Sequence, residues 1–159
     1  MSTPLAGKRA TPTADPTSAD TMVGLRHALR SLERQVSDAM RINLDPAGLS
    51  VEDWAVISLL ADGEGHTMAE VIDAASIPPA SATRLVDRLV SSVLLHRTTD
   101  AHDRRRVLVA LAPRGRQLYA KLAPAQAQIA GLLAARMGAG TMAELIQALG
   151  TADAALRGG

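Results

Sequence analysis

The sequence predicts a mainly α-helical protein that carries one small β-hairpin. Aromatic residues make up only 1% of the 159 residues, so Ala, Leu and Val must fill the core, and chains rich in Ala and Leu favour helices. Apolar residues recur at helical spacing along most of the chain, and only residues 94–111 switch to an alternating pattern. These two observations define the fold class, and each element follows from a local pattern.

The first helix is predicted at about residues 20–43. Residues 1–18 hold three of the eight prolines and few apolar side chains, so we expect them to form a disordered tail. The apolar stripe of the helix that follows has spacings of three and four: Leu25, Leu29, Leu32, Val36 and Met40. The segment 45–48 (Asp-Pro-Ala-Gly) ends this helix.

Two capping-box patterns mark the next helices. Ser50 is followed three residues later by Asp53, and Thr67 is followed by Glu70 in the same way. After a turn at 76–79, a third helix is predicted over 79–92, with Pro79 at its first position. Its apolar face consists of Ala82, Leu85, Val86 and Leu89.

A hairpin and two more helices complete the predicted order. Residues 94–97 and 107–111 read as strands, joined by the polar segment 98–106. Helical spacing returns at about 115–136, where Pro124 is expected to kink or interrupt the helix, and again at 141–156. The last helix carries one apolar stripe: Met142, Leu145, Ile146, Leu149 and Leu156.

The positive charge of the chain is concentrated in one block. Residues 81–121 contain nine Lys or Arg and three acids, a net charge of +6, whereas the remainder carries −5. Such asymmetry is typical of proteins that bind a polyanion, although a solvated basic face would give the same count.

A helix pair followed by a basic hairpin is the order of a winged helix-turn-helix. Its second helix fits the major groove of DNA, and a hairpin tip rich in Arg suits the minor groove. The residues expected to face DNA are Pro79, Ser81, Thr83, Arg84 and Arg88 on the helix, and Arg104, Arg105 and Arg106 on the tip. We expect Asp103 to pair with one of these tip arginines and to hold the tip in shape.

Two stretches resemble the MarR family of bacterial transcription regulators. Residues 81–89 (SATRLVDRL) resemble its recognition helix, and residues 103–115 (DRRRVLVALAPRG) resemble its wing and the start of the next helix. The resemblance implies a winged helix-turn-helix lobe at 49–112, between dimerisation helices at 19–48 and 113–157. It also implies a homodimer in which Asp103 shapes the wing tip and Arg105 enters the minor groove.

Three features depart from the pattern of that family. The turn at 91–93 (Ser-Ser-Val) lacks the usual Gly, and Ala112 stands where a Thr usually caps the following helix. Loss of that cap is expected to cost about 1 kcal/mol. The pair Pro78-Pro79 is also atypical and is expected to alter the angle of the recognition helix.

Members of the family commonly respond to small ligands, so we sought candidate ligand residues. These are Arg34, Met40, Arg41, Trp54 and His66. For Trp54 a role in the core is favoured over a ligand wall, and for Arg34 and Arg41 a surface charge is favoured over a ligand contact. Arg114, Arg116 and Lys121 are interpreted either as contacts to DNA phosphates or as solvated charges.

The sequence therefore predicts a ligand-responsive DNA-binding regulator. We expect a homodimeric repressor that a small aromatic acid or CoA thioester releases from a pseudo-palindromic operator. The alternative is a winged-helix interaction module that binds an acidic protein. Neither hypothesis involves catalysis, since the chain lacks Cys, a Gly-rich phosphate loop, a nucleophile elbow and a metal-ligand cluster. We expect a cytoplasmic protein with no cofactor, no metal and no membrane contact.

Overall fold

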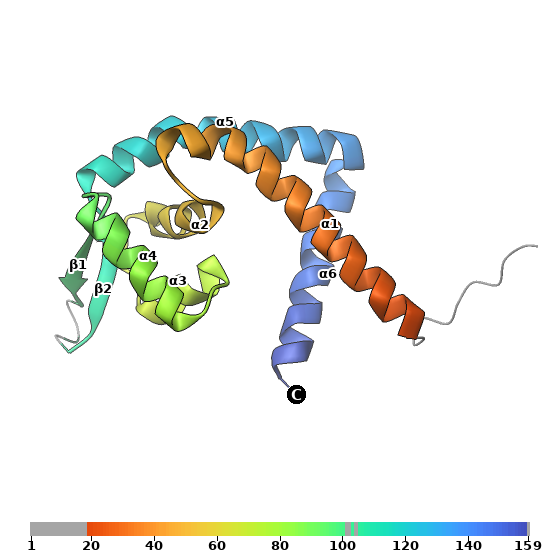
Figure 1. Cartoon of the computed structure of the whole chain (residues 1–159), viewed down its shortest axis with the longest axis horizontal. Helices are drawn as coiled ribbons and strands as arrows, with labels where there is room; N and C mark the ends of the chain where they lie inside the picture. The colour runs from red at the N-terminus through yellow and green to blue at the C-terminus, as the bar shows by residue number, and fades with distance from the viewer. Residues whose placement is uncertain (1–18, 101–102, 104, 159) are drawn as a thin grey trace, which may run out of the picture. The chain divides into compact units, whose positions relative to one another are not determined.

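The computed structural model describes residues 19–100, 103 and 105–158, and Figure 1 shows their arrangement into helices and one hairpin. The elements in chain order are α1 (Ala19–Leu44), η1 (Asp45–Ala47), α2 (Val51–Leu59), η2 (Leu60–Asp62), α3 (Met68–Ala75), α4 (Pro79–Ser91), β1 (Leu95–Thr99), β2 (Val107–Leu111), α5 (Pro113–Met137) and α6 (Ala139–Arg157). This order confirms the predicted fold class. The tail expected over residues 1–18 lies outside the described residues.

The chain divides into two units, residues 1–37 and 38–159. The described part of the first unit is the N-terminal portion of α1, where the Ser37 hydroxyl donates to Glu33 over 2.8 Å. Apolar side chains of this portion remain exposed: Met22, Val23, Leu25 and Leu29. The apolar stripe of this portion of α1 is therefore not buried within the chain. Burial of such a stripe against a partner surface is what stabilises an amphipathic helix.

The second unit contains the hydrophobic core. Every element from the end of α1 to the start of α5 except η1 contributes buried side chains, including Leu44, Ile57, Leu60, Val71, Val86, Leu89, Val109 and Leu122. Both predicted capping boxes are present: the Ser50 side chain accepts from the Asp53 amide, and Thr67 accepts from the Glu70 amide. Each acidic side chain in turn accepts from the amide of its N-cap residue, so both helix starts are satisfied locally.

The strands β1 and β2 form an antiparallel hairpin in which Leu95 pairs with Leu111 and Thr99 with Val107. Both Leu95 and Leu111 are buried, which fixes the base of the hairpin to the core. A third backbone segment joins at His66, whose amide and carbonyl both bond to Val109. The β2 bounds match the prediction, whereas β1 runs two residues further toward the tip than expected.

The turn after α4 has a backbone that normally requires glycine. Val93 has φ of +60°, and its amide bonds to the Val90 carbonyl while the Leu94 amide bonds to Leu89. This pair of bonds is a Schellman motif, in which the left-handed residue is usually Gly. The missing Gly noted in the sequence therefore leaves a β-branched residue in a strained conformation.

Helix α5 starts two residues earlier than predicted and continues through Pro124 without a break. Proline is well suited to the first position of a helix, so Pro113 begins α5 in place of Gly115. No side chain caps this helix at Ala112, as the sequence predicts. The Arg116 guanidinium donates to the Leu111 carbonyl over 2.7 Å, which satisfies a strand carbonyl and no helix amide.

Gly115 allows a close approach between α5 and the turn before the hairpin. A Cβ atom at this position would lie 2.1 Å from the Leu94 carbonyl oxygen, which already accepts from the Ala112 amide. Any larger residue must therefore push α5 away from the hairpin base. Close packing, and not an unusual backbone angle, is the reason for glycine here.

Within the described residues no helix taken alone has the length and apolar character needed to cross a membrane. Helix α5 and residues 140–157 of α6 meet that criterion only when joined, across a bend of 104°.

Candidate nucleic-acid interface

Helix α4 has one anchored face and one exposed face. Ala82, Leu85, Val86 and Leu89 are buried, as predicted, and they fix the helix to the core. Its N-terminal turns expose four of the predicted DNA-facing residues: Pro79, Ser81, Thr83 and Arg84. The Thr83 hydroxyl donates to the Pro79 carbonyl over 3.1 Å, so its oxygen is held on the helix surface as an acceptor.

Arg88, the fifth predicted contact on α4, is held by a buried carboxylate. Its two terminal nitrogens donate to the two carboxylate oxygens of Asp53 at 2.9 and 2.7 Å. Asp53 is 1% exposed, whereas the Arg88 side chain remains half exposed. The hydrogen bond to Asp53 raises the pKa of Arg88 above its usual value.

This ion pair fixes the recognition helix to the start of α2. Asp53 also accepts from the Ser50 amide, so one carboxylate both begins α2 and holds α4. Bidentate pairs of this kind define orientation as well as contribute energy. Residue spacing predicts Asp53 only as a cap, because its partner Arg88 lies 35 residues away.

A second ion pair joins α4 to the hairpin. Arg97 on β1 donates to Asp87 on α4 over 2.6 Å, and both side chains are about half exposed. The neighbouring residues Asp87 and Arg88 thus connect the recognition helix to the hairpin and to α2. The relative position of helix and hairpin is therefore set by charges at the C-terminal half of α4.

The wing tip contains exposed cations around an acidic turn residue. The Asp103 carboxylate accepts from the Arg105 amide over 3.0 Å, and its carbonyl accepts from the Arg106 amide. Asp103 thus shapes the tip through backbone bonds, whereas the Arg106 guanidinium lies 3.7 Å from Asp100. Arg105 and Arg106 are both exposed, and Arg104 lies outside the described residues.

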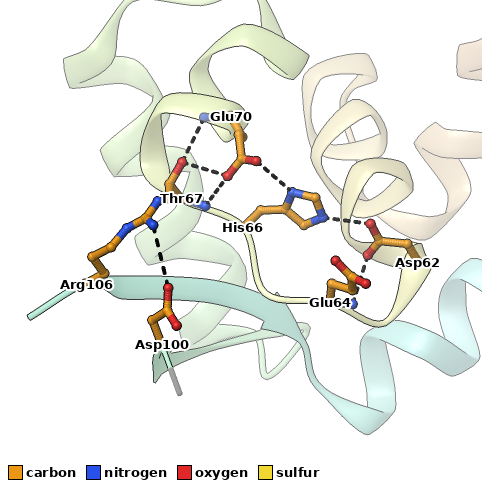
Figure 2. Close-up of polar contacts among 7 residues, drawn as sticks. All are labelled: Asp62, Glu64, His66, Thr67, Glu70, Asp100 and Arg106. Atoms are coloured by element: carbon orange, nitrogen blue, oxygen red, sulfur yellow. Dashed lines mark hydrogen bonds and ion pairs between the residues drawn. The ribbon is translucent and has the colours of Figure 1, made fainter. Parts of the chain in front are cut away.

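Figure 2 shows a polar cluster where the α2–α3 connection meets the hairpin. The His66 Nε2 atom lies 2.8 Å from Asp62, and its Nδ1 atom, which is buried without a hydrogen-bond partner, lies 3.6 Å from Glu70. A hydrogen bond from the Glu64 amide, and then the one with His66, lowers the pKa of Asp62. Hydrogen bonds from Thr67 lower the pKa of Glu70.

The remaining candidate ligand residues each have different surroundings. Trp54 is 7% exposed and stacks on Tyr119 with ring centroids 5.4 Å apart, which confirms the predicted core role. Met40 packs partly buried against the core, and Arg41 pairs with Asp38 on the helix surface. Arg34 is an exposed side chain of the first unit.

A helix pair anchored by an apolar face, followed by a basic antiparallel hairpin, defines the winged helix-turn-helix class. In this class the second helix enters the major groove of duplex DNA. The described residues that meet this requirement are the exposed ones of α4 and of the wing tip.

Comparisons with known proteins specify the class further. Residues 47–106 match the family model described as MarR family. The transcriptional repressor NicR of Pseudomonas putida is 27% identical over 146 residues, which cover 89% of this chain and 92% of NicR.

Solved structures share the fold. The structure of NadR in complex with 4-hydroxyphenylacetate has a TM-score of 0.69 at 25% identity, covering 89% of this chain and 96% of NadR. A mutant MarR from E. coli in complex with operator DNA has a TM-score of 0.71 at 21% identity, covering 84% and 96%. Over residues 47–106 the chain is therefore similar to the MarR family, a family of DNA-binding transcription regulators.

Proposed function

We propose that this protein is a homodimeric, ligand-responsive repressor that binds a pseudo-palindromic operator. The observation that carries the proposal is the division of α4 into a buried apolar face and an exposed polar N-terminal half. Such a helix can enter a major groove without losing the contacts that hold it in the fold. The relative NicR is a repressor, and the E. coli MarR structure contains operator DNA, which supports the proposal.

The roles of the residues follow from their surroundings. Ser81, Thr83 and Arg84 contact base edges, and Pro79 lies against the sugar-phosphate backbone. Arg105 enters the minor groove, with Arg104 and Arg106 beside it and Asp103 shaping the turn. Arg88 acts as a positioning residue, because its guanidinium is already bound to Asp53 and sets the angle of α4.

Exposed apolar side chains support a dimer. Large side chains are exposed on the helices proposed for dimerisation: Met22, Val23, Leu25, Leu29, Leu132, Ile146, Leu149 and Leu156. Soluble monomers rarely expose this many large apolar groups on neighbouring turns. A second copy of the chain would cover them, and dimers of this class bind two half-sites about 34–36 Å apart, one helical turn of DNA.

The effector in this proposal is a small aromatic acid. NadR was crystallised with 4-hydroxyphenylacetate, an aromatic acid, which supports this class of effector. The effector must bind the DNA-incompetent arrangement more tightly than the competent one, since equal affinity would shift no equilibrium.

Fluorescence anisotropy with the DNA upstream of the gene tests the proposal. Arg84→Ala and Arg105→Ala should each weaken specific binding by about 1–3 kcal/mol, because each removes a contact to DNA. Arg136→Ala is the matched control: it removes an exposed cation from the last turn of α5 and should leave the affinity unchanged. Unchanged affinity in both test variants, with an intact circular dichroism spectrum, would refute these assignments.

A further inference from the structure

One face of the hairpin changes along its length from buried to exposed. Side chains alternate between the two faces of a strand, so Leu95, Arg97 and Thr99 share one face of β1. Leu95 is buried at the base of the hairpin, whereas Thr99 is exposed near the tip. Arg97 lies between them, and its guanidinium donates to Asp87 of α4 over 2.6 Å. The middle of β1 thus contacts the helix that lies beside it in Figure 1.

The partner of Arg97 is the only acidic residue in the sequence of α4. Asp87 lies on the exposed side of the helix, about one turn beyond Thr83 and Arg84. An unpaired carboxylate at this position would repel the phosphates of any DNA that α4 approaches. The ion pair with Arg97 neutralises that charge, so the exposed side of α4 carries no unpaired acid.

The guanidinium of Arg97 is fixed in place but not fully used. Within the described part of the chain its hydrogen-bond partner is Asp87, which it binds through one terminal nitrogen. A guanidinium carries further N–H donors, and the Arg97 side chain is 42% exposed. Arg88 differs, because both of its terminal nitrogens are bound to Asp53. Arg97 therefore combines a fixed position with donors that remain free for a further anionic acceptor.

The proposed function places a DNA strand next to this side chain. If α4 occupies a major groove and the wing tip enters the adjacent minor groove, a sugar-phosphate strand separates the two. That strand must pass between α4 and the wing tip, over the middle of the hairpin. Arg97 projects from the middle of β1 toward α4, which is where the strand would pass.

We infer that Arg97 binds a phosphate of the strand between the two grooves, and that Asp87 is the positioning residue that holds its guanidinium there. The inference rests on the proposed function and adds a contact that is independent of base sequence. Guanidinium groups suit phosphate oxygens, because their N–H donors form a planar fork. The contact fixes how α4 and the wing sit on either side of the strand.

Fluorescence anisotropy at several salt concentrations tests the inference, with the upstream duplex and an unrelated duplex of equal length. Arg97→Gln should make the slope of log affinity against log salt shallower by about 2, because each phosphate contributes about 0.9 and a dimer carries two copies of Arg97. The fold-loss in affinity should be similar for the two duplexes, as expected for a phosphate contact. Arg97→Lys keeps the charge and should retain most of the slope.

Two further variants separate phosphate binding from a purely structural role. Asp87→Asn breaks the same ion pair but keeps the guanidinium, so it should lose less affinity than Arg97→Gln and keep the wild-type slope. Arg136→Gln is the matched control: it removes an exposed cation from the last turn of α5 and should leave the slope unchanged. Circular dichroism checks that each variant folds, and Arg97→Met, which keeps an aliphatic side chain, replaces Arg97→Gln if that variant unfolds.

Two results overturn the inference alone, provided that the wild type binds the duplex. One is a wild-type slope in the folded Arg97→Gln variant. The other is an equal loss of affinity in Arg97→Gln and Asp87→Asn with no change of slope in either, which would show that the pair only joins α4 to the hairpin. A wild-type protein that binds neither duplex contradicts the proposed function, and the inference with it.

Discussion

At the scale of single residues, the role of each side chain depends on its neighbours in the fold. Asp53 was predictable as a helix cap, because its partner Ser50 is three residues away. Its second partner, Arg88, is 35 residues away, and only the packing of α2 against α4 brings the two together. Breaking a pair that includes a buried carboxylate is costly, so these two residues belong to the framework of the interface.

Val93 leads to a prediction about stability. Its φ of +60° is costly for a β-branched residue, by about 1–2 kcal/mol, and its side chain is 58% exposed, so it contributes little packing. We expect Val93→Gly to raise the free energy of unfolding by about 0.5–1 kcal/mol, since the greater freedom of glycine in the unfolded chain offsets part of the relief. Urea denaturation measures this change.

Val93→Ala is the matched control for this prediction. It removes the branched side chain but keeps the Cβ atom that causes the strain, so its gain should be smaller than that of the glycine variant. A glycine variant less stable than the wild type would show that the side chain of Val93 packs more than its exposure suggests.

At the scale of elements, the helices and the second strand could be predicted because their signals are local. The apolar spacing of α4 and the capping residues of α2 and α3 act within one or two turns. The bounds of β1 and α5 differ from the prediction because they depend on features that the spacing of apolar residues does not encode. Strand β1 extends because β2 pairs with it to Thr99, and α5 begins at Pro113 because proline suits a first helical position.

The segment between α2 and α3 provides a pH-dependent prediction. The pKa values of Asp62 and Glu70 are lowered in the folded chain, so both carboxylates stabilise the fold when ionised, above their usual pKa of about 4. That contribution is lost as the pH falls through the lowered folded values. We expect the double variant Asp62→Asn/Glu70→Gln to be less stable than the wild type at pH 7, and the difference to shrink as the pH falls through the lowered folded-state pKa values.

Urea denaturation of both proteins at several pH values between 7 and 3 measures this difference. The other carboxylates titrate in both proteins and cancel in the comparison. A difference that stays constant over this range would show that the two carboxylates do not stabilise the fold through their charge.

At the scale of the whole molecule, the candidate interface was predictable as a set of residue types but not as a working surface. The sequence indicated which side of α4 is polar, and the structure exposes Ser81, Thr83 and Arg84 there. Two ion pairs hold this surface in place, and only the structure reveals them: Asp53–Arg88 and Asp87–Arg97. These pairs join segments that are far apart in the chain, so spacing alone cannot identify them.

The salt dependence of binding to the upstream duplex tests the central claim most directly. If exposed cations of two α4 helices and two wings neutralise phosphates, the logarithm of the association constant should fall linearly with the logarithm of the salt concentration. Each neutralised phosphate contributes about −0.9 to the slope, so a dimer that makes at least four such contacts should give about −4 or steeper. A flat response, or no binding to duplex DNA at low salt, would contradict the account and favour an acidic protein as the partner.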